Sequence, residues 1–303
     1  MSKTPVEKRG GVNHGVCSST AADERPRVSN RLLSFIRVLG FALVTVITGL
    51  AISLSRRLGM WGGNRLTVAA GCAKWNHYWG WWCMKVFGDR VVVRGTPPPP
   101  GTLIVPNHTG YADIMAVSSV MPCLFVAKSE AADWPVLGLF IRLAAHVIVT
   151  RENPRSLFQA INDVEQHLKA GITVCVFLEG TSSGGASVLP FRPSMVEAAL
   201  RAGAQLTPAA ILWDAPLPAV VDEDIAYWKD HRFPVHFWKF LGLRGVTATI
   251  EFGQKIPTAG LSRKTAAGHA QAAVEAMLRG ENTDKHRQAQ TSTDETDNML
   301  PCV

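Results

Sequence analysis

The pattern of apolar and polar positions begins with a polar segment and then two long apolar ones. Residues 1–30 are rich in Ser, Thr, Gly and charge and show no periodicity, which predicts a disordered basic leader. Residues 32–54 contain a single charge, Arg37, and residues 64–87 form a second candidate helix. We therefore expect residues 31–88 to be a membrane-anchoring pair of helices.

The sequence leaves open how the first of these helices meets the membrane. Its uninterrupted apolar part would extend about 25 Å, slightly less than a hydrocarbon core of about 30 Å. It can span if Arg37, Arg56 and Arg57 reach the headgroups, or it can lie in the interface. The second helix carries a group of large aromatics that is typical of headgroup level: Trp75, Tyr78, Trp79, Trp81 and Trp82.

Beyond these helices, short apolar runs alternate with longer runs of helical spacing. The predicted strands are residues 91–93, 102–105, 124–127, 146–150, 172–178, 205–212 and 246–252. The predicted helices are residues 136–143, 156–170, 234–241 and 263–279. This alternation predicts an α/β domain over residues 89–280, with a central, mostly parallel sheet flanked by helices. The polar residues 281–303 are expected to form a disordered tail.

One candidate for chemistry follows the strand predicted at residues 102–105. His108 lies in the turn after it, and Asp113 lies five positions later at the start of a helical run. A carboxylate is favourable at a helix start, and from there it can orient the imidazole as a general base. Taken alone, the same pair also fits a polar turn residue and a helix cap.

The composition narrows the classes of molecule that this protein can bind. Hydrophobic residues make up 47%, Trp is counted at 9, and the formal net charge is +7. These values favour contact with membranes and anionic lipid, and the sequence lacks the motifs of nucleic-acid-binding proteins. The six cysteines form no CxxC pair and the histidines show no metal-ligand spacing, so we expect reduced thiols and no metal.

Further polar clusters follow other predicted strands. Lys128 and Glu130 follow one, Arg151 follows the next, and a Gly-rich turn beginning at Glu179 follows the third. Cations and exposed backbone amides at the strand ends of one sheet suit a phosphorylated or thioester-bearing ligand.

In order and spacing these clusters resemble the glycerophospholipid acyltransferase family, which includes 1-acylglycerol-3-phosphate acyltransferases. The resemblance covers roughly residues 90–255. It rests on Asn107, His108 and Asp113, on Lys128 and Glu130 with Pro135, Gly138 and Arg151, on Phe177 with Glu179, Gly180 and Thr181, and on Pro208.

The resemblance implies a membrane-bound enzyme that moves an acyl chain from acyl-CoA or acyl carrier protein to a lysolipid hydroxyl. No further cofactor is implied, and the expected location is the cytoplasmic face of the inner membrane. His108 would be the base and Asp113 its orienting partner, without a nucleophilic side chain because a thioester is already activated. The residues expected to bind the substrate are Asn107, Lys128, Arg151, Glu179, Gly180, Thr181, Ser182 and Arg192.

Two departures from the family pattern concern the acceptor. The usual Phe-Pro-Glu-Gly-Thr-Arg block has Leu178 in place of Pro and Ser182 in place of Arg. A hydroxyl cannot replace the bidentate charge of Arg on a phosphate, although Arg192 or Arg151 can offer a cation. The Glu-Gly-Thr-Ser-Ser-Gly form is similar to the branch that includes lyso-ornithine lipid acyltransferases.

Two alternative functions remain open. Gly180 to Gly184 match the G-x-S-x-G elbow of serine hydrolases, with Asp214 and then His231 or His236 in the expected order. That elbow requires a helix directly after Ser182, which the following Gly and Pro residues disfavour. The other alternative is a non-catalytic lipid-binding membrane protein, which has no need of His108 and Asp113 at this spacing.

Overall fold

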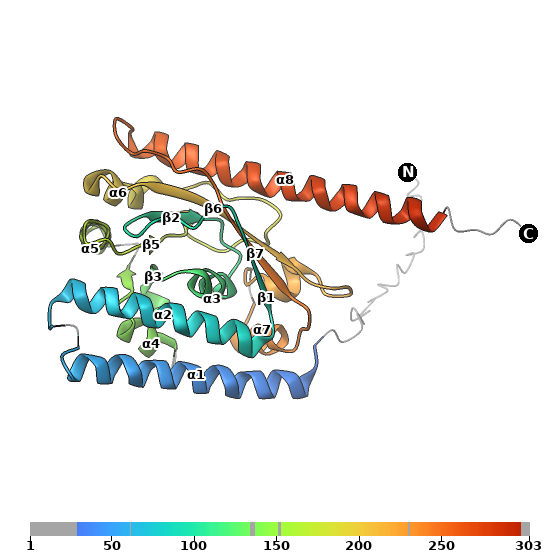
Figure 1. The fold of residues 1–303 in the computed structure, drawn as a ribbon, viewed down its shortest axis with the longest axis horizontal. Coiled ribbons are helices and arrows are strands. Elements are labelled where there is room, and N and C mark those ends of the chain that lie inside the picture. The colour runs from blue at the N-terminus through green and yellow to red at the C-terminus, as the bar shows by residue number, and fades with distance from the viewer. Residues whose placement is uncertain (1–28, 61, 134–136, 151–152, 230, 298–303) are drawn as a thin grey trace, which may run out of the picture.

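A seven-stranded sheet forms the centre of the molecule, which is a computed structural model describing residues 29–60, 62–133, 137–150, 153–229 and 231–297 (Figure 1). The strands follow the order β1-β7-β6-β2-β5-β3-β4, and β6 with β7 is the antiparallel pair. All other neighbours pair in parallel, which confirms the predicted mostly parallel sheet. The strands are β1 Arg90–Arg94, β2 Leu103–Pro106, β3 Leu124–Lys128, β4 Val147–Val149, β5 Val174–Cys175, β6 Leu206–Asp214 and β7 Thr247–Phe252.

Helices cover both faces of this sheet. On one face lie α1 Arg31–Arg57, α2 Arg65–Phe87, α3 Tyr111–Val120, α4 Leu137–Leu143 and α7 Phe233–Leu241. On the other lie α5 Pro154–Lys169, α6 Val196–Ala202 and α8 Arg263–Asp297. Short helical turns are formed by η1 Ser129–Asp133, η2 Pro193–Met195 and η3 Val221–Ile225. Alternation along β2 divides the core, because Ile104 packs toward the α1–α2 face and Leu103 and Val105 toward the α5–α8 face.

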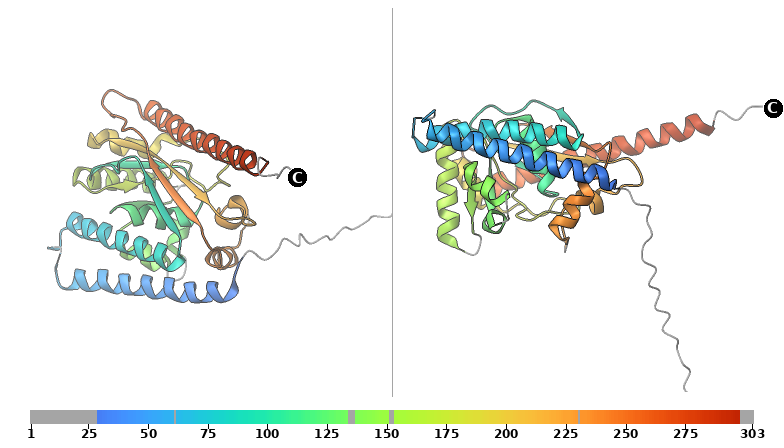
Figure 2. Two further views of the ribbon diagram at one scale, coloured as in Figure 1. Left: turned by 45° about the vertical axis from the view of Figure 1, so that its right-hand side comes forward. Right: turned by 90° about the horizontal axis from the view of Figure 1, so that it is seen from below.

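Helix α1 lies lengthwise against the rest of the molecule, beside α2 (Figure 2). Its inward face contains small and polar side chains, including buried Thr45, Thr48 and Gly49. Its outward face carries a stripe of exposed apolar side chains: Leu32, Phe35, Ile36, Leu39, Leu43, Val46, Ile47, Leu50 and Leu54. This distribution is the reverse of that of a helix packed against a water-soluble core.

Two expectations for these helices were wrong in part. Arg37 does not reach outward, because it is buried and donates hydrogen bonds to the carbonyls of Leu241 and Leu243. The aromatic group of α2 is also divided: Trp79 is 3% exposed and donates to the Thr45 hydroxyl over 3.0 Å. Tyr78, Trp81 and Trp82 are exposed.

Helices α2 and α3 approach each other unusually closely at Gly80. A Cβ added there would lie 2.4 Å from Ser118 Cβ and 2.7 Å from the backbone nitrogen of Ser119. These distances are too short for any side chain, so Gly80 lets the two helices pack almost backbone to backbone. Asn76 adds a buried hydrogen bond to the Ser118 hydroxyl over 3.0 Å.

The last helix is longer than the sequence predicts. α8 continues to Asp297, well into the segment 281–303 for which we expected disorder. Residues 281–297 contain neither Pro nor Gly, so nothing in them interrupts a helix once it has started. Strand β5, in contrast, is shorter than the sequence predicts: the apolar run covers 172–178, but only two residues pair. The chain turns away after Val176 to form the loop beside His108.

Candidate active site

The strand order explains why distant polar clusters meet. β5 lies between β2 and β3, and all three run parallel. His108 follows β2, Lys128 ends β3, and the loop containing Glu179 follows β5. The C-terminal ends of three adjacent strands therefore bring the three clusters to one edge of the sheet.

His108 and Asp113 form the hydrogen-bonded pair that their spacing predicts. Nδ1 of His108 lies 2.9 Å from Oδ2 of Asp113. An ionised carboxylate can only accept a hydrogen bond here, so the neutral ring carries its hydrogen on Nδ1 and leaves Nε2 as a base. The ring stacks on Phe177, with centroids 3.9 Å apart and planes 20° from parallel.

Asp113 is held in place by donors on both carboxylate oxygens. Oδ2 accepts from the backbone nitrogens of Thr109 and Gly110 over 2.6 and 2.9 Å, besides His108. Oδ1 accepts from the Thr109 hydroxyl over 2.7 Å and from the indole nitrogen of Trp213 over 2.8 Å. Burial alone would raise the pKa of Asp113, but these hydrogen bonds and the charge of His108 outweigh it and lower the pKa below its ordinary value.

Glu179 positions the backbone around His108 and takes no part in lining the cavity described below. Its Oε1 accepts from the backbone nitrogen of His108 over 2.7 Å, and its Oε2 accepts from that of Leu189 over 2.8 Å. Ser183 donates its backbone N–H to the carbonyl of His108 over 2.9 Å, so the loop after β5 holds His108 from both sides. Burial raises the pKa of Glu179 to about 7, against the opposing effect of the two backbone hydrogen bonds.

A largely apolar cavity of about 410 Å³ opens beside His108. Its polar lining includes Lys128, Glu130, Thr181 and Ser182. Gly180 also lines the cavity. Apolar side chains from α1, α2, α3, α4 and α7 line the remainder, among them Phe41, Trp79, Met115, Phe140 and Phe237. An elongated apolar substrate with one polar end fits such a lining.

Three of the predicted substrate-binding residues, Asn107, Glu179 and Arg192, do not line this cavity. Asn107 is buried and forms two hydrogen bonds to the backbone of Ile211, over 3.0 and 2.7 Å, which tie β2 to β6. Arg192 is exposed and is absent from the cavity lining, so it does not replace the arginine missing at position 182. Arg151 and Pro135 lie outside the described residues.

The serine-hydrolase arrangement is not formed. No helix follows Ser182 directly, and the next helical turn begins at Pro193. The Ser182 hydroxyl donates to the backbone carbonyl of Tyr227, and His236 Nδ1 is engaged by the Tyr111 hydroxyl over 2.8 Å. Asp214 is exposed.

Sequence reasoning missed several supporting residues. Trp213 lies one residue beyond the strand predicted at 205–212, and its contact with Asp113 crosses 100 positions. Tyr227 belongs to a segment without a pattern, yet its backbone N–H donates to the carbonyl of Thr109 over 2.8 Å. Phe177 was seen as part of a motif, and only the fold shows its stacking on His108.

Within the part of the chain that the structure describes, no cluster of three or more His, Cys, Asp or Glu side chains is arranged to hold a metal ion. Four of the six cysteines lie among the residues that the structure describes. All four are free and buried: Cys72, Cys83, Cys123 and Cys175. Burial raises the pKa of each of these thiols.

Comparison with known proteins identifies similar chains. The family model described as Acyltransferase matches residues 90–212. A lyso-ornithine lipid O-acyltransferase of Pseudomonas aeruginosa is 30% identical over 260 residues, which cover 82% of this chain and 93% of the relative. A lyso-ornithine lipid O-acyltransferase of Rhodobacter capsulatus is 32% identical over 201 residues, covering 63% of this chain and 71% of the relative.

A solved structure shares the fold. The 1-acyl-sn-glycerophosphate acyltransferase PlsC of Thermotoga maritima aligns with a TM-score of 0.62 and 22% identity, covering 84% of this chain and 96% of that one. At this identity the likeness supports the fold alone.

Proposed function

Because this chain belongs to the acyltransferase family, we propose that it moves a fatty acyl chain from a thioester donor, acyl-CoA or acyl carrier protein, to the free hydroxyl of a lysolipid. The observation that carries this proposal is the His108–Asp113 pair at the polar end of an apolar cavity. A non-catalytic lipid-binding protein has no need of an imidazole oriented by a buried carboxylate with five donors around it, and such arrangements cluster at functional sites.

The geometry suits direct transfer. Nε2 of His108 takes the proton of the acceptor hydroxyl while the hydroxyl oxygen attacks the thioester carbonyl carbon. The C–S bond then breaks, and the imidazolium returns the proton to the departing thiolate, so that an ester and a free thiol result. Asp113 stabilises the imidazolium between these steps and keeps the ring in one orientation. No side-chain nucleophile is required, in agreement with Ser182 bonding to a backbone carbonyl.

The cavity lining favours an amino-acid headgroup over a phosphate monoester. Lys128 and Glu130 line the same cavity, one charge of each sign. Ornithine carries an ammonium and a carboxylate, which these two side chains complement, whereas a phosphate dianion would meet the carboxylate of Glu130. We therefore propose a lyso-ornithine lipid as the preferred acceptor, in line with the names of the two relatives described above.

The outward face of α1 supports a membrane-bound enzyme. α1 is a helix long and apolar enough to cross a bilayer, but it packs along its length against α2 and α7. We propose that it lies in the plane of the membrane surface, with its apolar stripe toward the acyl chains and Tyr78, Trp81 and Trp82 of α2 near the headgroups. We place this surface at the inner membrane, with the active site on the cytoplasmic side.

The same helices connect the proposed membrane surface with the site. Phe41 of α1 and Trp79 of α2 line the cavity that contains His108. Acyl chains can therefore reach the base along apolar side chains without passing through water.

Acyl transfer in detergent with labelled donors tests this function. Wild type, His108→Ala and Ser182→Ala are compared with lyso-ornithine lipid and with 1-acylglycerol-3-phosphate, each with acyl-CoA and with acyl carrier protein. We expect labelled diacylated product with lyso-ornithine lipid, lost in His108→Ala and retained in Ser182→Ala. Release of free fatty acid that depends on Ser182 would show a hydrolase instead, and preferential use of 1-acylglycerol-3-phosphate would contradict the proposed acceptor.

A further inference from the structure

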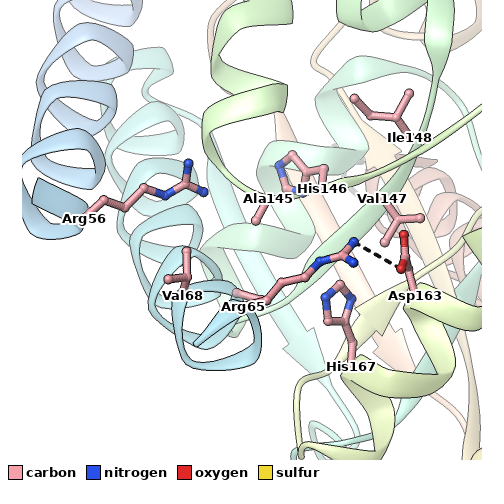
Figure 3. A pocket seen from close by; sticks show the side chains of 10 residues that line it. Arg56, Arg65, Val68, Ala145, His146, Val147, Ile148, Asp163 and His167 are labelled. Atoms are coloured by element: carbon pink, nitrogen blue, oxygen red, sulfur yellow. Dashed lines mark ion pairs between the residues drawn. The ribbon is translucent and has the colours of Figure 1, made fainter. Parts of the chain in front are cut away.

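A second cavity, of about 600 Å³, lies at the end of the α1–α2 pair, between these helices, β4 and α5 (Figure 3). Its lining includes Arg56, Arg65, His146, Val147, Asp163 and His167. We call it the basic cavity. The catalytic pair lies elsewhere, because neither His108 nor Asp113 lines it.

Positive charge exceeds negative charge in the basic cavity. Arg65, the first residue of α2, forms an ion pair with Asp163 over 3.1 Å. Arg56, near the end of α1, extends toward the same space, and its Nη2 contacts Cys72 Sγ over 3.6 Å (Figure 3). The cavity lining thus includes two guanidinium groups and one carboxylate, and the surplus of one positive charge favours an anionic ligand.

His167 gives a second indication that a ligand belongs there. It lies four residues after Asp163 on α5, so both side chains occupy one face of that helix. His167 is 5% exposed, and among the described residues its Nδ1 has no hydrogen-bond partner. Burial lowers the pKa of His167, with the charge of Asp163 opposing and that of Arg65 adding to the effect. A buried ring nitrogen without a partner is costly, and because the ring lines the cavity, a turn of the imidazole that brings this nitrogen to a ligand oxygen would remove that cost.

His146 separates the basic cavity from the catalytic one, since it lines both. Its Nδ1 accepts the backbone N–H of Phe125 over 3.1 Å, which fixes the ring between the two spaces. A ligand in the basic cavity would thus lie directly behind the wall of the catalytic cavity.

We propose that the basic cavity binds the phosphate group of an anionic ligand, through Arg56, Arg65 and His167. The planar guanidinium matches two phosphate oxygens at once, and the imidazole supplies a further hydrogen bond. A cavity of about 600 Å³ has room for more than a bare phosphate. Two sources share this chemistry: a phospholipid headgroup, favoured by exposed Leu54 and Leu58 beside Arg56, and a soluble phosphate compound such as coenzyme A. The proposal rests on this cavity and does not depend on acyl transfer.

Calorimetric titration of the full-length protein in a neutral detergent tests the site with three probes: inorganic phosphate, coenzyme A and dihexanoyl phosphatidylglycerol. We expect saturable binding of at least one probe, weakened about tenfold or more by Arg65→Gln and by His167→Leu, as for loss of one charge-assisted hydrogen bond. Arg57→Gln is the matched control, because it removes the same charge one residue along from Arg56 and outside the cavity lining. It should change affinity less than about twofold.

The probes identify the source of the phosphate. Tightest binding of phosphatidylglycerol would indicate a lipid site, and tightest binding of coenzyme A a site for a soluble phosphate compound. His167→Leu should unfold at the same temperature as wild type or higher, because it removes an unpaired buried nitrogen. The proposal is wrong if no probe binds saturably, if Arg65→Gln changes none of the affinities, or if Arg57→Gln weakens binding as much as Arg65→Gln.

Discussion

Trp213 donates its indole N–H to Oδ1 of Asp113 over 2.8 Å, on the carboxylate oxygen that His108 does not use. Trp213 of β6 therefore holds the carboxylate of Asp113, and that carboxylate in turn orients the ring of His108. This contact joins the central sheet to the start of α3, and it is one of the causes that lower the pKa of Asp113.

Trp213→Phe keeps the aromatic packing and removes this hydrogen bond. We expect kcat/KM to fall about tenfold, corresponding to about 1.4 kcal/mol of lost positioning. Because the bond is one of the causes that lower the pKa of Asp113, its loss raises that pKa. The measurement is acyl transfer as a function of pH, with Trp238→Phe on exposed α7 surface as the control. An unchanged kcat/KM in Trp213→Phe, or an equal loss in Trp238→Phe, would contradict the role assigned to Trp213.

Asp113→Asn should be far more severe. The amide presents hydrogens where the carboxylate accepts from Thr109, Gly110 and Trp213, so at least one donor faces another donor. We expect kcat to fall about 10³- to 10⁴-fold, as when the carboxylate of a catalytic His–Asp pair is neutralised, and the free energy of unfolding to fall by about 2–4 kcal/mol. Steady-state kinetics and chemical unfolding measure the two effects. Asp214→Asn, on an exposed neighbour of Trp213, should change neither; near-normal turnover of Asp113→Asn would exclude the proposed mechanism.

Asp89 predicts a pH-dependent difference in stability. Burial raises the pKa of its carboxyl from 3.8 to about 7, against the opposing charge of Arg37. The folded protein therefore binds this proton more tightly than the unfolded chain, and the resulting stability is present below pH 3.8 and lost as pH rises through about 7. Asp89→Asn does not titrate, so it should become progressively more stable relative to wild type between these two pH values.

Thermal unfolding of wild type and Asp89→Asn at several pH values measures that difference, which should level off above pH 7 at up to a few kcal/mol. A constant difference between wild type and Asp89→Asn at all pH values would contradict the raised pKa of Asp89.

Gly110→Ala tests the close approach of two loops. An added Cβ would lie 2.9 Å from both Cβ and the backbone nitrogen of Tyr227, so one of the loops must move. We expect a loss of about 1–3 kcal/mol in the free energy of unfolding and a larger relative loss of activity, because Gly110 also donates to Asp113. In Gly268→Ala on α8 no described atom lies within 4 Å of the added Cβ, and this control should be neutral or stabilising by up to about 1 kcal/mol. Equal effects of the two changes would refute the steric explanation.

Much of the fold follows from local patterns in the sequence. The strand at β2 and the helix start at α3 are encoded by neighbouring residues, so the His108–Asp113 contact across five positions was predictable. The same holds for the mostly parallel sheet, which follows from alternating strands and helices. The family resemblance agrees with the comparisons.

Long-range partners were not predictable in this way. Residue type did not reveal that Glu179 bonds to backbone, because its partners at His108 and Leu189 depend on the order of β2 and β5. Trp79 was grouped with exposed aromatics, since apolar residues are spread around the whole of α2 and give no signal for its inward face. The basic cavity combines residues of three helices and a strand that are scattered over more than 100 positions, so no local pattern marks it.

The tight contact at Gly80 sets the spacing between α2 and α3. α2 carries exposed Trp81 and Trp82, while α3 carries Asp113, and the backbone of α2 at Gly80 lies directly against Ser118 and Ser119 of α3. This close contact restrains sliding of the two helices, and it thereby restrains the distance from the aromatic rings to the His108–Asp113 pair. If those rings rest at headgroup level, acceptors are selected partly by how deep their hydroxyl sits in the lipid layer, independently of any contact with the headgroup.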